Sequence, residues 1–187
     1  GGNLTPMPRY VVLLRGVNVG KTQRVPMADF KTLLQGLGHQ DVTTVLNSGN
    51  AVFTSASRTP GRLAQNIARA LADSLGVSAA VVVKSGAEFA ALVAANPMAV
   101  PEQEHSKFLV VFANDAATLQ GLESLQPLVQ APERLVVGPH AAYLHCAAGI
   151  LQSRVGAALL GKVGQSVTTR NWGTTLRLLR LCGTEAA

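Results

Sequence analysis

Two short polar stretches, residues 15–21 (RGVNVGK) and 47–50 (NSGN), carry the side chains best suited to chemistry. Arg15 offers a planar fork of N–H donors for a carboxylate or phosphate, and Lys21 adds a mobile cation. The asparagines and the serine supply amide and hydroxyl groups, and the glycines let the backbone approach a ligand closely. Together they have the composition of an anion or nucleotide site.

Neither stretch matches a known phosphate-binding motif. The glycines of GVNVGK are too closely spaced for the GxxxxGK[ST] loop, and no dinucleotide-binding spacing is present. A purely structural interpretation therefore stays open beside the chemical one. In that interpretation Gly16 and Gly20 end a strand and shape a loop, Ser48 and Gly49 form a hairpin turn, and the asparagines bond their own backbone.

The elements around these stretches bring them to one sheet edge. Strands are predicted at residues 9–14, 42–46, 51–54 and 79–83, and helices at 26–37 and 60–75. The order strand, helix, strand, strand, helix, strand is that of a ferredoxin-like split βαβ unit. In that unit the first two strands run in the same direction, so both polar stretches lie beside the start of the first helix, whose N-terminus favours anions.

The second half repeats this element order incompletely. Strands are predicted at 107–112, 135–137 and 142–146, and helices at 116–125 and 154–160. We expect an α+β protein of two tandem ferredoxin-like subdomains, residues 7–84 and 105–187, joined by a helical linker at 85–104. A C-terminal helix within residues 168–181, capped by Thr169 or Asn171, closes the chain, and the second half lacks a clear final strand. Residues 1–6 are left out of the fold.

Five motifs occur in order along the chain: LLRGVNVG, VPM, SGNAVF, NP and TTRNW. Their combination resembles the bacterial domain-of-unknown-function family 1697. The resemblance implies an α+β fold with ferredoxin-like parts and no established activity. Two departures from the pattern weaken a role for Lys21: residues 21–23 differ from the segment expected before VPM, and Asn47 stands where glutamine is common.

The TTRNW motif adds a third stretch, residues 168–172. In the structural interpretation Asn171 or Thr169 caps the last helix, Trp172 anchors it and Arg170 is solvated. In the sharper hypothesis Arg170 reaches across to Arg15 and completes a cationic site. The candidate ligand-binding residues are Arg15, Asn18, Lys21, Asn47, Ser48, Asn50, Arg170, Asn171 and Trp172.

Charge and composition favour an anionic partner. The formal net charge is +6 and the pI is near 9.9, although only 14% of residues are charged. Binding of RNA or single-stranded nucleic acid is one alternative, but aromatics make up only 4% and the strands carrying Tyr10 and Phe53 lack the RNP1 pattern. A structural or regulatory protein that dimerises is another.

No motif in the sequence identifies a catalytic residue. The histidines are scattered, and Cys146 and Cys182 are expected to be two buried thiols rather than a disulfide or metal site. We expect no cofactor, no metal and no membrane association. The default expectation is a cytoplasmic monomer or homodimer that binds a small anionic ligand or nucleotide.

Overall fold

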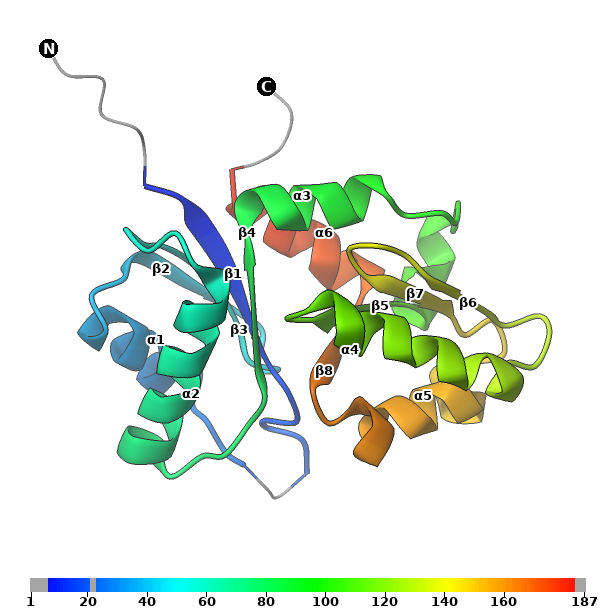
Figure 1. Cartoon of the computed structure of the whole chain (residues 1–187), viewed down its shortest axis with the longest axis horizontal. Helices are drawn as coiled ribbons and strands as arrows, with labels where there is room; N and C mark the ends of the chain where they lie inside the picture. Colours follow the sequence, from blue (N-terminus) through cyan, green and yellow to red (C-terminus); the bar gives the residue numbers. More distant parts are fainter. Residues whose placement is uncertain (1–6, 21–22, 184–187) are drawn as a thin grey trace, which may run out of the picture.

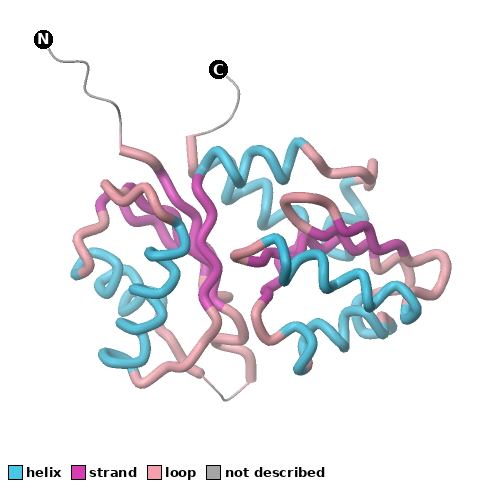
Figure 2. Tube along the Cα trace, in the orientation of Figure 1, coloured by secondary structure: helices cyan, strands magenta, loops and turns pink. Residues whose placement is uncertain are grey.

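The computed structural model describes residues 7–20 and 23–183. Within these residues the chain forms two four-stranded antiparallel sheets, with helices on their outer faces and between them (Figures 1 and 2). None of the described helices has the length and apolarity needed to cross a bilayer. The fold is therefore α+β with a tandem ferredoxin-like arrangement, as the sequence predicts.

The first sheet has the strand order β2-β3-β1-β4 and carries two helices on its outer face. Its elements are β1 (Arg9–Leu14), α1 (Met27–Gly36), β2 (Gln40–Val45), β3 (Asn50–Thr54), α2 (Pro60–Leu75) and β4 (Val81–Ser85). Proline is tolerated at the first position of α2 because that N–H has no helical partner, and Gly76 ends the helix in the left-handed conformation at φ +64°. The apolar faces of α1 and α2 bury Tyr10, Val12 and Leu14.

The second sheet has the equivalent order β6-β7-β5-β8. Its elements are β5 (Phe108–Ala113), α4 (Ala116–Gln120), β6 (Arg134–Val137), β7 (Ala142–His145), α5 (Arg154–Leu160) and β8 (Val167–Asn171). The helix predicted over 116–125 stops at Gln120 and continues as a 3-10 helix over 121–128 that contains Pro127. The outer face of this sheet packs against α4, α5 and that 3-10 helix, and these contacts form a separate hydrophobic core.

The C-terminal helix begins after the Asn171 cap, one of the two caps predicted, but the residues before it form a strand that was not predicted. Residues 168–171 belong to β8, which supplies the missing final strand, and helix α6 begins only at Trp172 and ends at Leu181. Consecutive β-branched residues favour a strand here. Asn171 is both the last strand residue and the N-cap, because its side chain accepts a hydrogen bond from the Thr174 N–H.

A third core joins the two sheets. Helix α3 (Gly86–Ala94) and helix α6 lie between the inner faces of the sheets, where α3 begins with a capping box made by Ser85 and Glu88. Strands β1 and β5 are consequently buried on both faces: Val11 faces this central core and Val12 the outer one. Burial on both faces explains why these strands are apolar throughout instead of alternating.

The two sheets repeat not only strand order but also register. Lys84 of β4 pairs with Val11 of β1, and Arg170 of β8 pairs with Val110 of β5. Each cation is the last residue before the N-cap of the helix that enters the central core. Lys84 and Arg170 therefore occupy equivalent positions, each facing the opposite half.

Candidate functional site

Arg170 links the second sheet to the first. Its Nε donates to Asn50 Oδ1 at 2.5 Å, and its Nη2 donates to the backbone oxygens of Leu14 at 2.7 Å and Ser48 at 3.0 Å. Its Nη1 donates to Thr168 Oγ1 at 2.6 Å and to the carbonyl of Thr169 at 2.8 Å. All five N–H groups of the guanidinium thus have acceptors.

The acceptors of Arg170 are all neutral. The side chain is only 8% exposed, and within the described residues it pairs with no carboxylate. Burial lowers the pKa of Arg170 to about 10, so the group stays charged at neutral pH. The interface between the sheets therefore holds a buried positive charge that only dipoles stabilise.

The SGN stretch is shaped to receive this arginine. Gly49 has φ +84°, and a Cβ there would lie 2.7 Å from Leu14 Cβ and from Val17 Cγ2, so only glycine fits. Asn50 is fully buried, and its Nδ2 donates to the carbonyl of Val45 at 3.0 Å and to Ser48 Oγ at 2.8 Å. These bonds orient Asn50 Oδ1 toward Arg170.

Asn18 organises the loop after β1. It has φ +58°, which asparagine tolerates better than most residues, and its side chain binds both backbone groups of Val25. Its Nδ2 also donates to the carbonyl of Asn47 at 2.7 Å. Asn18 therefore joins the RGVNVG and NSGN loops as a structural crosslink, which is the structural alternative raised by the sequence.

Arg15 makes a second contact between the halves. Its Nη2 donates to the carbonyls of Leu160 at 2.9 Å and Gly161 at 3.1 Å, at the C-terminal end of α5. A cation is favourable there because the helix dipole is negative at that end. The side chain is half-buried, and burial lowers its pKa. Its Nη1 donates to the carbonyl of Val167 at 3.5 Å, and its Nε has no hydrogen-bond partner among the described residues.

A cavity of about 640 Å³ lies where these contacts meet, and we call it the arginine cavity. Its described lining holds two cations and no acidic residue. Hydroxyl groups surround them, and four of the exposed apolar side chains of the protein form part of its wall. The lining includes Arg15, Arg170, Ser48, Ser106, Thr168, Thr169, Asn171, Thr174, Val19, Leu46, Ile150 and Leu160.

The arginine cavity gathers four of the nine candidate residues: Arg15, Ser48, Arg170 and Asn171. Of the others, Asn18 and Asn50 shape the loops behind it, and Asn47 is exposed. Trp172 is packed against Phe108 in the central core, with ring centroids 5.3 Å apart. Lys21 lies outside the described residues.

The helix that begins at the arginine cavity is α6, whose N-cap Asn171 and first-turn Thr174 line it. The sequence pointed instead to α1, but none of the described residues at the start of α1 is in the lining. The sequence also does not predict the apolar wall of the arginine cavity, because Val19, Leu46 and Leu160 follow no periodic pattern. The positive dipole end of α6 adds to the charge of the two arginines.

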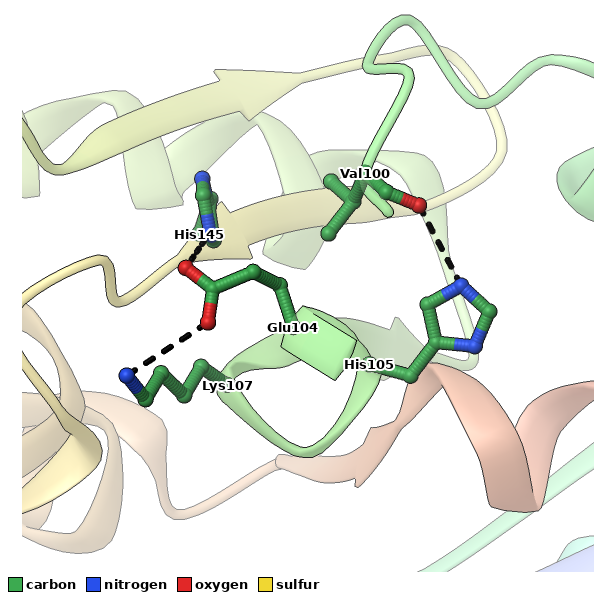
Figure 3. A network of polar contacts seen from close by, with 5 residues as sticks. All are labelled: Val100, Glu104, His105, Lys107 and His145. Atoms are coloured by element: carbon green, nitrogen blue, oxygen red, sulfur yellow. Dashed lines mark hydrogen bonds and ion pairs between the residues drawn. The ribbon is translucent and has the colours of Figure 1, made fainter. Parts of the chain in front are cut away.

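The histidines form no site with the arginine cavity. His145 Nε2 lies 3.6 Å from Glu104 Oε1, and Lys107 Nζ lies 3.4 Å from Glu104 Oε2. Figure 3 shows His145 and Lys107 on either side of Glu104, with His105 turned toward the carbonyl of Val100. The 3-10 helix over 102–107 meets β7 here, and His145 Nε2 has no hydrogen-bond partner within the described residues. Within the described residues no group of histidine, cysteine and acidic side chains could hold a metal, and both cysteines are buried free thiols.

Fold and cavity together define a class of protein: two ferredoxin-like units joined across a central core, with a cationic cavity between them. Residues 7–143 match the family described as a protein of unknown function, DUF1697, and the chain belongs to that family. The conserved bacterial protein SP0830 from Streptococcus pneumoniae is similar in structure, with a TM-score of 0.76 and 22% identity. That similarity covers 94% of this chain and 99% of the other. A comparison with curated proteins found no match.

Proposed function

We propose that the protein binds a small organic anion, such as a nucleotide or another ligand with a phosphate or carboxylate group, in the arginine cavity. The observation that carries this proposal is the pair of cations, Arg15 and Arg170, in one cavity whose described lining has no acidic residue. Such a cavity attracts negative charge, and an anion bound there would stabilise the buried Arg170.

The two arginines have different roles in this proposal. Arg15 is the direct donor, because it is half-buried and keeps free N–H groups. Arg170 gives its N–H groups to protein acceptors, so it contributes charge and holds the wall in place. The hydroxyls of Ser48 and Thr174 supply further hydrogen bonds, and the apolar wall takes the uncharged part of the ligand.

A thermal-shift screen of nucleotides, phosphorylated metabolites and organic carboxylates tests the proposal. A ligand at 100 times its dissociation constant stabilises the folded state by about 2.7 kcal/mol. Arg15→Ala should abolish the shift for the best ligand, and Arg62→Ala, an exposed arginine of α2, should leave it unchanged. Titration calorimetry then measures the dissociation constant for each variant. Equal affinity of Arg15→Ala and the unmodified protein would overturn the assignment, and Arg15→Lys serves if the alanine variant does not fold.

Nucleic-acid binding finds less support in the geometry. Tyr10 and Phe53 are buried against each other beneath α1 and α2, so they offer no surface on which bases could stack. An anisotropy titration with single-stranded oligonucleotides at low salt gives the direct comparison. Saturable binding that survives Arg15→Ala would favour this alternative.

A partner surface is the second candidate, and one observation favours it. Val19 is 66% exposed, Leu46 55% and Leu160 77%, and all three line the arginine cavity. Exposed apolar groups gathered at one place are typical of interaction sites. Light scattering at micromolar concentration distinguishes the two: a dimer that Leu160→Ser disrupts supports the partner surface, and a monomer supports the small ligand.

A further inference from the structure

Lys84 lies at a second crossing between the halves. It occupies the position equivalent to Arg170, one residue before the N-cap of α3. There it lines a cavity of about 200 Å³, which we call the lysine cavity, together with residues of the second half. Asn114, at the end of β5, joins the halves beside it, because its side chain bonds the Val81 carbonyl at 2.7 Å and the Val83 N–H at 3.1 Å.

The surroundings of Lys84 differ from those of Arg170. Lys84 is 8% exposed, but within the described residues its amine makes neither a hydrogen bond nor an ion pair. The two carboxylates of the cavity each accept one backbone hydrogen bond: Glu88 accepts from the Ser85 N–H at 2.9 Å, and Asp115 accepts from the Thr118 N–H at 2.7 Å. The stem of Lys84 is buried, but its amine is not among the fully buried polar atoms, so the nitrogen opens onto the lysine cavity, where water or a small ligand can reach it.

Burial also changes the reactivity of the amine. Desolvation lowers the pKa of Lys84, and the attraction of Glu88 and Asp115 opposes this effect without cancelling it. At neutral pH a larger fraction of Lys84 than of a surface lysine is therefore the neutral amine. The neutral amine is the nucleophilic form, and desolvated lysines are the ones that form Schiff bases.

We propose that Lys84 is a covalent binding site for a small carbonyl compound, an aldehyde or ketone held as an imine in the lysine cavity. The geometry supports it in three ways: a buried stem whose amine makes no hydrogen bond or ion pair within the described residues, a cavity onto which that amine opens, and two carboxylates in the same lining. The volume is larger than that of a cavity known to hold benzene, so a compound of up to about ten non-hydrogen atoms fits.

The reaction needs no further reagent. The nitrogen lone pair of Lys84 attacks the carbonyl carbon, a C–N bond forms, and the carbonyl π pair moves to oxygen. Two protons pass from nitrogen to that oxygen, the C–O bond breaks, and one water leaves as the C=N bond forms. The imine is stabilised when protonated, because Glu88 and Asp115 provide negative charge beside the resulting cation.

Reductive trapping tests this proposal on the full chain. The protein is incubated at pH 7.5 with limiting glycolaldehyde and cyanoborohydride, and peptide mass mapping gives the labelling rate at each lysine. We expect Lys84 to be labelled at least tenfold faster than the exposed Lys31 and Lys162. 9-Anthraldehyde, whose three fused rings exceed the volume of the cavity, should lose this preference.

Two comparisons keep the outcome interpretable. Lys84→Arg should remove the fast label and leave the rates at Lys31 and Lys162 unchanged, with circular dichroism confirming the fold. The mapping on the unmodified protein stands even if this variant does not fold. Labelling of Lys84 at or below the rate of the exposed lysines would overturn the proposal, as would equally fast labelling with 9-anthraldehyde.

Discussion

Arg170 and Lys84 stand at equivalent positions in the two sheets, yet they face opposite surroundings. Arg170 has six neutral acceptors placed around its guanidinium, four of them from residues of the first half. Lys84 reaches the end of β5 and the turn before β7 and has no such acceptors among the described residues. A shared topology therefore fixes where a cation points, and the receiving loop decides whether that cation becomes a structural link or an available reactive group.

The largest difference should appear when each cation is replaced by methionine. Arg170→Met leaves the buried acceptors of Asn50, Leu14 and Ser48 without a donor, which costs about 3 kcal/mol or more of unfolding free energy. Lys84→Met removes an amine that makes no hydrogen bond or ion pair within the described residues and leaves its buried stem apolar, so its stability should lie within about 1 kcal/mol of the unmodified protein or exceed it. Urea denaturation monitored by circular dichroism measures both. Equal losses would show that the two positions are equivalent in energy as well as in register.

The turn that receives Arg170 provides the second comparison. Gly49→Ala should destabilise by about 2 kcal/mol, because φ is +84° and the new Cβ would clash with Leu14 and Val17. Gly36→Ala is the control, since Gly36 is the last residue of α1 and has open space around it. Thermal unfolding should show a clear drop in Tm only for the first variant. A small effect of Gly49→Ala would mean that the loop can relax without losing Arg170.

The smallest expected effect concerns pH at the Lys84 position. The pKa of Lys84 is lowered in the folded state, so the unfolded chain binds more protons between that pKa and the ordinary value of about 10.5. The stability penalty is therefore complete below the folded pKa and shrinks as pH rises toward about 10.5. The free energy of unfolding of the unmodified protein should rise relative to that of Lys84→Met over this range. A constant difference would show that Lys84 is not desolvated in solution.

Much of the fold follows from local pattern. The apolar run of β1 and the proline and glycine at the ends of α2 predict those elements directly. The last strand of the second sheet was harder to predict, because no turn separates β8 from α6. Asn171 is both the last residue of the strand and the N-cap of the helix. The equivalent pattern in the first half, a valine-rich strand, a cation, a cap and a helix, is the signal that could have located β8.

The candidate site was predicted in part. Strand order predicts that the RGVNVG and NSGN loops meet, and the Asn18 side chain joins them. The destination of Arg170 could not be derived in this way, because its acceptor Leu14 lies 156 positions away in the sequence. No local sequence pattern predicts that the side chain of Arg170 will donate to backbone carbonyls. The sequence does not predict the burial of Lys84 either, because a single lysine after three valines is typical of the exposed end of a strand.

The position of α6 has a consequence for how the protein is made. This last helix and residues of β5 and β7 cover the inner face of the first sheet, including Val11 and Val52. During synthesis the first half emerges before the residues of the second half that pack on this face, so the face is only partly covered, by α3, until β5, β7 and α6 have been made. Because segments that expose apolar surface during synthesis are prone to aggregate, safe folding of the first half depends on elements that follow it in the chain.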